Sequence, residues 1–172
     1  MQNSHPDTSI PKDCRVDESG QPIIFYHGTP EIFDEFRSND IGVHFGSLEQ
    51  ARRRARKKAG AEDYRIIPVF LMLRNPLRTA DAGCWFSPNQ AFEKIDLALK
   101  RLGLPRLPAI EGDRMTRFER ARSYLESLGF DGIIYRNTAE GKGDSMIVFS
   151  NEQIHPLEPV LARQKRRKSR RP

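Results

Sequence analysis

The sequence of 172 residues has little cysteine, no long apolar run and no apolar leader, and each absence excludes a class of protein. Its two cysteines, Cys14 and Cys84, are 70 residues apart, a spacing that matches no metal site, redox motif or disulfide scaffold. No apolar run approaches the roughly 18 residues that a membrane span needs. Residues 1–17 lack the apolar core of a secretory signal. We therefore expect no membrane association and a reducing, cytoplasmic location.

Several common site patterns are missing as well. The chain has no P-loop, no G-x-G-x-x-G turn and no H-E-x-x-H helix. It also lacks the G-x-S-x-G elbow of serine hydrolases and any spaced Cys/His ligand set. These absences argue against an ordinary nucleotide hydrolase, a Rossmann dehydrogenase, a serine hydrolase and a zinc enzyme.

Positive charge is concentrated in two stretches. Residues 52–58 contain six basic residues and residues 163–171 contain seven, and neither stretch has an acid. The chain has a net charge of +6, and without these thirteen residues it would have −7. Such blocks attract anions, so a phosphate-bearing small molecule, RNA or an acidic protein are candidate partners of residues 52–58. A solvated helix face explains this stretch equally well, and the tail at 163–172 is typical of nonspecific nucleic-acid contact or of localisation.

Short apolar runs alternate with amphipathic helical patterns, which predicts one α+β domain over residues 16–160. We expect a flexible leader at 1–15 and a disordered basic tail at 161–172. Pro68 indicates an edge position or a bulge in its strand. Ser47 and Gln50 form a capping-box pattern at the start of the first helix. The expected strands are 23–27, 41–46, 65–73, 132–135, 146–149 and 153–155, and the expected helices are 48–59, 88–102 and 113–128.

One histidine stands out because it ends an apolar strand and is followed directly by Gly28 and Thr29. Taken alone, His27 is more typical of a core histidine whose ring bonds a backbone group. Four segments that follow one another along the chain change this interpretation. They are residues 25–29 (FYHGT), 42–47 (GVHFGS), 70–77 (FLMLRNPL) and 129–154, which contains GFDGIIY and SMIVF.

Together these segments resemble the ADP-ribosyltransferase superfamily, and more narrowly the ADP-ribosyltransferase domains of phage and mobile-element polyvalent proteins. A D-x-x-G-x-P lead at residues 17–22 is similar to theirs. The resemblance covers about residues 16–156. It implies a split antiparallel β-sandwich with inserted helices and with NAD, the substrate, held between the two small sheets.

The resemblance also implies roles for residues. His27 would bond the adenosine ribose, the backbone of Gly28 would hold the nicotinamide carboxamide, and an aromatic ring of the second motif would pack on nicotinamide. That pattern has tyrosine where this chain has His44. The NAD-binding residues implied in this way are Tyr26, His27, Gly28, Thr29, His44, Phe45, Ser47, Asn137 and Ser145.

The catalytic carboxylate departs from the wider pattern. Poly-ADP-ribose polymerases have a glutamate where this chain has Ser145, and serine cannot supply the charge. Domains of the narrower group have N-x-x-E before this strand, which here selects Asn137 and Glu140, with Asp144 as the second candidate. Both acids could equally be solvated loop residues.

Breaking the nicotinamide–ribose bond produces an oxocarbenium-like sugar that a carboxylate stabilises, and Glu140 is our candidate for this carboxylate. His27 is the second catalytic candidate. The reaction needs no metal. Three functions remain open: a mono-ADP-ribosyltransferase acting on a protein or nucleic acid, an NAD glycohydrolase, and an inactive basic nucleic-acid-binding module. The first would act in the cytoplasm or as an effector delivered into a target cell.

Overall fold

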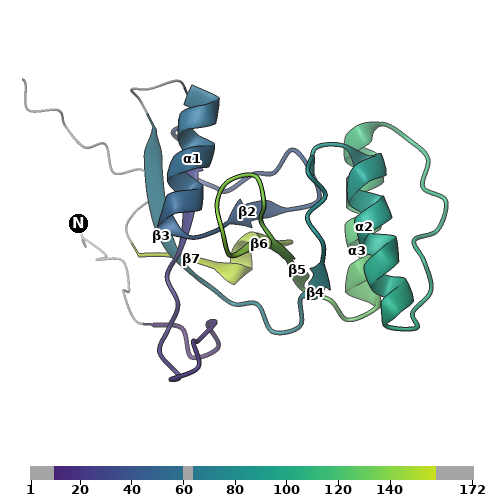
Figure 1. The fold of residues 1–172 in the computed structure, drawn as a ribbon, viewed down its shortest axis with the longest axis horizontal. Helices are drawn as coiled ribbons and strands as arrows, with labels where there is room; N and C mark the ends of the chain where they lie inside the picture. Colours follow the sequence, from purple (N-terminus) through teal and green to yellow (C-terminus); the bar gives the residue numbers. More distant parts are fainter. Residues whose placement is uncertain (1–9, 60–63, 158–172) are drawn as a thin grey trace, which may run out of the picture.

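The structure is a computed structural model that describes residues 10–59 and 64–157. Two small sheets carry the fold (Figure 1). The three-stranded sheet has the order β1-β3-β7 and is formed by β1 (Phe25–Thr29), β3 (Arg65–Leu71) and β7 (Ile154–Pro156). The four-stranded sheet has the order β2-β6-β5-β4 and is formed by β2 (Val43–Phe45), β6 (Asp144–Val148), β5 (Gly132–Arg136) and β4 (Leu77–Thr79). The helices are α1 (Leu48–Ala59), α2 (Pro88–Arg101), α3 (Arg114–Ser127) and the short η1 (Asn151–Gln153).

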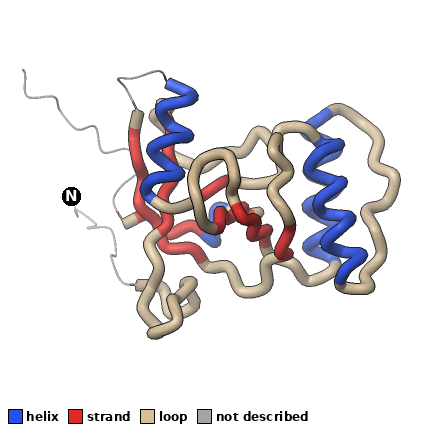
Figure 2. Tube along the Cα trace, viewed as in Figure 1, coloured by secondary structure: helices blue, strands red, loops and turns tan. Residues whose placement is uncertain are grey.

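A backbone bridge joins the two sheets, where Tyr26 of β1 pairs with Gly46 just after β2. In Figure 2, α1 lies beside the three-stranded sheet at one end of the molecule, and α2 and α3 lie side by side at the other. This arrangement confirms the expected α+β class with two sheets and inserted helices.

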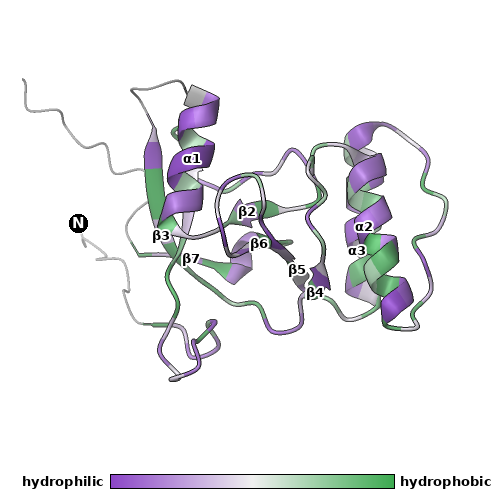
Figure 3. Cartoon of the chain, in the orientation of Figure 1, coloured by the Kyte–Doolittle hydropathy of each residue, from purple (hydrophilic) through white to green (hydrophobic). Residues whose placement is uncertain are grey.

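Alternation along the strands divides the core in two. On β5 and β6, Ile134, Met146 and Val148 face the three-stranded sheet, and Ile133 and Ile147 face α2 and α3. The hydropathy colouring shows α1 as mostly hydrophilic, whereas α2 and α3 mix both kinds of residue (Figure 3). Because neighbouring residues of a strand face opposite sides, these apolar runs place one core between the sheets and a second under the helix pair.

One strand pair departs from the expected antiparallel arrangement. β4 runs parallel to β5, with Leu77 opposite Ile133. A parallel pair needs a long crossover, and the segment that contains α2 and α3 supplies it. No strand was expected between residues 73 and 132, but the three residues that follow Pro76 form β4.

Pro68 does not lie in an edge strand, because β3 is the central strand of its sheet. Its partner on β1 is Tyr26, whose backbone bonds point the other way, to Gly46. By alternation the nitrogen of Pro68 faces β7, and the carbonyl of Pro68 accepts the amide of Leu157 (3.0 Å), just beyond the last ladder pair at Val69. The missing N–H therefore removes one bond at the end of this pairing.

The described part of the expected leader is attached to the domain. The amide of Arg15 donates to the carbonyl of Leu71 (2.9 Å), and Cys14 is buried. The ordered domain thus begins before residue 16. The expected tail at 161–172 and the expected helix terminator Gly60 lie outside the described residues. No helix in the described part of the chain is long and apolar enough to cross a membrane.

Gly28 allows β1 and α1 to approach each other closely. A Cβ at this position would overlap the backbone carbonyl of Ala51, which cannot move without shifting α1. We expect Gly28→Ala to lower the free energy of unfolding by about 3 kcal/mol, at the upper end of overpacking effects. Urea denaturation measures this loss. Gly20→Ala is the comparison, because Gly20 has open space and only a left-handed φ, so its cost should be about 1 kcal/mol. Equal losses would contradict the steric argument.

Candidate functional site

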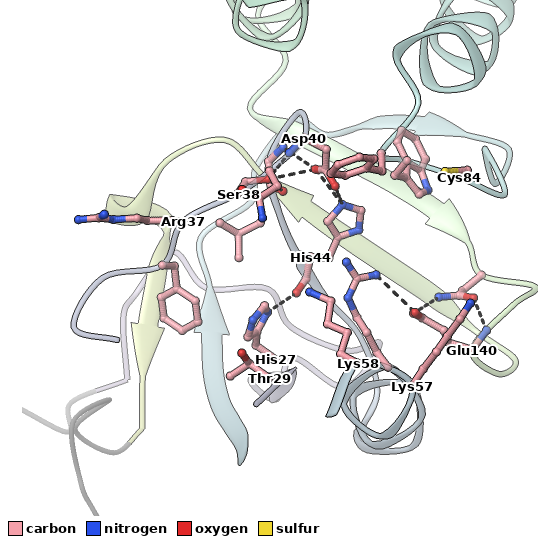
Figure 4. A pocket seen from close by; sticks show the side chains of 18 of the residues that line it. His27, Thr29, Arg37, Ser38, Asp40, His44, Lys57, Lys58, Cys84 and Glu140 are labelled. Atoms are coloured by element: carbon pink, nitrogen blue, oxygen red, sulfur yellow. Dashed lines mark hydrogen bonds and ion pairs between the residues drawn. The ribbon is translucent and has the colours of Figure 1, made fainter. Parts of the chain in front are cut away.

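A cleft of about 450 Å³ opens where β1 and β2 diverge (Figure 4). Five of the residues predicted from the sequence line it: His27, Thr29, His44, Asn137 and Glu140. A small hollow adjoins the cleft and shares His44, Glu140, Arg54 and Tyr135 with it. Four more predicted residues line this hollow: Tyr26, Gly28, Phe45 and Ser145. The structure thus brings nine of the ten predicted residues into one region.

Ser47 lines neither space. Its hydroxyl accepts the amide of Gln50 (3.3 Å), and the Gln50 side-chain oxygen accepts the amide of Ser47 (2.8 Å). This exchange confirms the capping box that the sequence predicts. Ser47 therefore fixes the start of α1, and its predicted contact with NAD stays a prediction.

His27 is held in one tautomer. Its Nδ1 donates to the backbone carbonyl of His44 (2.8 Å), so in the neutral ring Nε2 is left as a hydrogen-bond acceptor. The ring packs among Phe33, Phe36 and Phe45 with centroid distances of 5.4 to 6.1 Å. Burial lowers the pKa of His27 to about 4, and the nearby charges of Arg54 and Lys58 contribute. His27 is therefore a neutral acceptor at pH 7.

This depressed pKa predicts an acid-labile fold. An unfolded histidine titrates near 6.5, so between pH 6.5 and 4 the unfolded chain binds a proton that the folded chain does not. Stability should therefore fall as the pH drops through this window, by up to about 1.4 kcal/mol per pH unit from this group. His27→Gln should flatten the pH dependence measured by urea denaturation. An unchanged slope in His27→Gln would contradict the assignment.

The backbone of Gly28 faces the cleft side of β1. Tyr26 exchanges both backbone bonds with Gly46 (2.9 and 3.1 Å), and bonding direction alternates along a strand. The N–H and C=O of Gly28 therefore point the same way as those of Tyr26. Within the described residues Tyr26–Gly46 is an isolated antiparallel bridge, so His44 of β2, the next residue in this register, is not paired with Gly28. Gly28 lines the small hollow that adjoins the cleft.

His44 lies in a buried chain of polar groups that sequence reasoning missed. Its Nε2 contacts both carboxylate oxygens of Asp40 (3.1 Å each), and its Nδ1 contacts the hydroxyl of Tyr135 (3.3 Å). Burial alone would raise the pKa of Asp40, but the charge and hydrogen bond of His44 outweigh it and lower the pKa. Burial, with the charge of Glu140, raises the pKa of Tyr135. The His44 ring is thus fixed on two sides.

Trp85 completes an aromatic wall around this chain. Its ring centroid lies 4.9 Å from that of Tyr135 and 6.2 Å from that of His44. The residue is buried and also lines the cleft, so it both anchors its loop and shapes the site. Phe86, its neighbour, is exposed and packs under the guanidinium of Arg114 at 3.5 Å.

The N-x-x-E segment forms a turn that presents its carboxylate to the cleft. The side-chain oxygen of Asn137 accepts the amides of Ala139 (3.0 Å) and Glu140 (2.8 Å), and its nitrogen donates to Glu140 Oε2 (3.2 Å). Arg54 of α1 contacts the other oxygen, Oε1, at 3.4 Å. Both oxygens of Glu140 are thus held by donors.

The second candidate carboxylate has different surroundings. Asp144 begins β6, forms an ion pair with Arg78 (2.9 Å) and lines neither the cleft nor the hollow. Ser145 is buried and accepts a hydrogen bond from Asn137 Nδ2 (3.0 Å). The geometry favours Glu140 over Asp144 as the acid of the cleft.

The basic stretch of α1 divides by helical position. Arg53 pairs with Glu49, Arg54 with Glu140, and Arg56 bonds the hydroxyl of Tyr64. Lys57 and Lys58 are exposed and line the cleft (Figure 4). Within the described residues these two lysines have no ion-pair partner. Over the same residues, no group of three or more His, Cys, Asp or Glu side chains is arranged to hold a metal ion.

This is an α+β domain whose split sheets enclose a cleft with a histidine, a glycine backbone and a glutamate at its walls. Residues 17–158 match the family described as ADP-Ribosyltransferase in polyvalent proteins. The chain therefore belongs to this ADP-ribosyltransferase family, whose members use NAD as substrate, and the resemblance inferred from the four segments is confirmed.

Two other comparisons add little. The solved structure of an anti-CRISPR protein is 14% identical to the chain, covers 78% of it and 94% of its own length, and has a TM-score of 0.36. Such a low score carries no argument about function. Comparison with curated proteins gives no match.

Proposed function

We propose that this domain cleaves the nicotinamide–ribose bond of NAD and transfers ADP-ribose to a macromolecular acceptor. The observation that carries the proposal is the placement of Glu140 in the cleft, with Arg54 and Asn137 on its two oxygens, beside His27. Nicotinamide leaves as a neutral ring from a cationic one, so the reaction needs no general acid. It needs a carboxylate that stabilises the oxocarbenium-like sugar, and Glu140 supplies one.

The remaining predicted residues support binding of the dinucleotide. The neutral His27 offers Nε2 as an acceptor for a ribose hydroxyl. The outward-facing N–H and C=O of Gly28 match the two complementary groups of a carboxamide. His44, fixed by Asp40 and Tyr135, gives the cleft a rigid aromatic surface, and a fixed surface lowers the cost of ordering the substrate.

Lys57 and Lys58 suit the diphosphate of the same substrate. Both lie on the α1 side of the cleft, whereas the acids Glu31, Glu35 and Asp81 lie on loops that also line it. A compact diphosphate can contact the lysines alone, but a nucleic-acid strand crossing the cleft would also meet these acids. We therefore assign the lysines to NAD and leave nucleic acid as a partner for the exposed Arg52 and for the tail at 163–172.

One assay tests the function. The protein is incubated with NAD labelled in the adenosine half, together with a cell lysate or, separately, with RNA, and both transferred label and released nicotinamide are measured. Label on protein or RNA supports transfer and identifies the acceptor class. Nicotinamide release without transfer would make the chain an NAD glycohydrolase. Neither product, with nucleic acid bound, would favour the inactive nucleic-acid-binding module.

A salt titration decides whether the basic residues bind nucleic acid. Filter binding to duplex DNA should weaken with a log–log slope of about −0.9 per phosphate neutralised, and to single strands of about −0.7. Removing residues 163–172 should flatten this slope and leave NAD cleavage intact. Equal slopes would exclude the tail as a contact, and no binding at low salt would make protein the expected acceptor.

A further inference from the structure

We propose that Gln50 and Arg54 of α1 are positioning residues that hold the loop carrying Glu140 in its productive shape. The assignment of a productive shape rests on the proposed function. Neither residue belongs to the motifs that predicted the site. They are four residues apart and so share one face of α1, and both contact the 137–143 loop.

Gln50 uses its whole side-chain amide in this contact. The nitrogen donates to the carbonyls of Gly141 and Gly143 (3.4 Å each), and the oxygen accepts from the Ser47 amide (2.8 Å) and the Ser145 hydroxyl (3.3 Å). Two donors and two acceptor sites are all that an amide offers. Gln50 is 2% exposed, so its own side chain is shielded from water. A buried polar side chain so fully used joins the start of α1, β6 and the loop.

The chain is shaped to receive this amide. Gly141 and Gly143 have φ of 133° and 117°, a region that residues with a Cβ rarely adopt, and this backbone turns both carbonyls toward Gln50. Gly46 leaves the space that Gln50 occupies, because a Cβ there would overlap the Gln50 side-chain oxygen. Three glycines in two distant segments thus fit one buried side chain.

Arg54 acts on the carboxylate itself. Its Nη1 lies 3.4 Å from Glu140 Oε1, whereas Asn137 holds Oε2 from within the loop. Among the described residues, Glu140 is the one side chain that the Arg54 guanidinium pairs with. The Nε of Arg54 is buried without a hydrogen-bond partner. The Glu140 side chain is 19% exposed. One oxygen is therefore fixed by a helix and the other by the loop.

A catalytic carboxylate on a loop must be held in a fixed position. Loops are the mobile parts of a fold, and displacing a reacting group by about 1 Å can cost 10²-fold in rate. Attaching the loop to α1, which packs on β1 near His27, ties Glu140 to the wall that carries the other catalytic candidate. Arg54, which belongs to the basic stretch at residues 52–58, thus acts at the site by holding Glu140 in position.

Four variants test the proposal: Gln50→Met, Arg54→Met, Arg54→Lys and the control Arg53→Met, which removes only an exposed ion pair with Glu49. Steady-state NAD cleavage should show kcat lower by about 10- to 100-fold in Gln50→Met and Arg54→Met, with KM for NAD within about threefold. Arg54→Lys should recover part of the loss, because the positive charge remains. Arg53→Met should match the wild type.

Hydrogen exchange provides a readout that needs no catalysis. The amides of Asn137, Ala139 and Glu140 bond within the loop, and in Gln50→Met they should exchange roughly tenfold faster, as expected for the loss of about one net hydrogen bond. If Gln50→Met fails to fold, the Arg54 variants carry both measurements.

The outcomes separate this proposal from the proposed function. Unchanged loop exchange in the variants, or a loss that falls on KM with kcat preserved, would overturn the positioning role. A wild type that does not cleave NAD would overturn the proposed function, and faster loop exchange in Gln50→Met and Arg54→Met would still show the attachment. Faster loop exchange together with the kcat loss and its partial recovery in Arg54→Lys supports both.

Discussion

Replacing Glu140 by glutamine is expected to lower the rate of NAD cleavage by about 10²- to 10³-fold, the loss typical of removing one preorganised electrostatic contact to a transition state. Glutamine keeps the size of the side chain, but its single oxygen can accept from only one of the two donors, Asn137 or Arg54, and its NH2 faces the other. The change therefore removes the charge and one of the two hydrogen bonds that hold the group. Affinity for NAD, measured by calorimetry, should stay within about threefold, because the ground-state substrate has no sugar cation to stabilise.

Asp144→Asn is the matched control for this prediction. Asp144 lies four residues further along the chain and pairs with Arg78 outside the cleft. Its substitution removes one carboxylate of equal charge near the same strand and should leave cleavage unchanged. If activity is lost in Asp144→Asn and kept in Glu140→Gln, the carboxylate has been assigned to the wrong residue.

Local patterns predicted the parts of the fold that local forces determine. The capping box at Ser47 and the apolar runs that form β5 and β6 appear in the structure as expected. The first strand was predicted two residues too early, at 23–27, although it occupies Phe25–Thr29. Ile23 donates its amide to the carbonyl of Arg15 instead, and its side chain packs against the core between the sheets from outside the strand. Composition alone does not distinguish these two placements.

Long-range pairing accounts for the elements that sequence patterns missed. β4 has three residues, and its partner β5 lies more than fifty residues away. So short a strand has almost no period of its own, and it forms because α2 and α3 bring its edge to β5. The central position of β3 also depends on β7, which comes from the far end of the domain.

The site, like the fold, has parts that follow from local sequence patterns and parts that depend on long-range contacts. His27, Gly28, Asn137 and Glu140 lie in motifs with short spacings, which is why the sequence could predict them. The contacts that orient the site cannot be read from such spacings. Asp40 is four residues before His44 but lies outside its motif, and Tyr135, although it ends the GFDGIIY segment, contacts His44 from 91 residues away. Gln50 and Arg54 were visible only as a cap and as part of a basic stretch.

His27→Ala is expected to weaken NAD binding by about tenfold, because it removes one acceptor in a partly shielded site and the hydrogen bond that ties β1 to the carbonyl of His44. The loss should fall on affinity for ADP-ribose as well as NAD, since the proposed contact is with the adenosine ribose. Nicotinamide alone should bind the variant and the wild type equally.

Calorimetry with NAD, ADP-ribose and nicotinamide measures all three affinities. His27→Gln provides a comparison variant, because its amide can still bond His44 and still offer an acceptor to the cleft, so it should retain more affinity than His27→Ala. Circular dichroism establishes that each variant is folded. An NAD affinity in His27→Ala equal to that of the wild type, in a folded protein, would remove His27 from the binding site. The function of this histidine would then be to join the two sheets through its bond to His44.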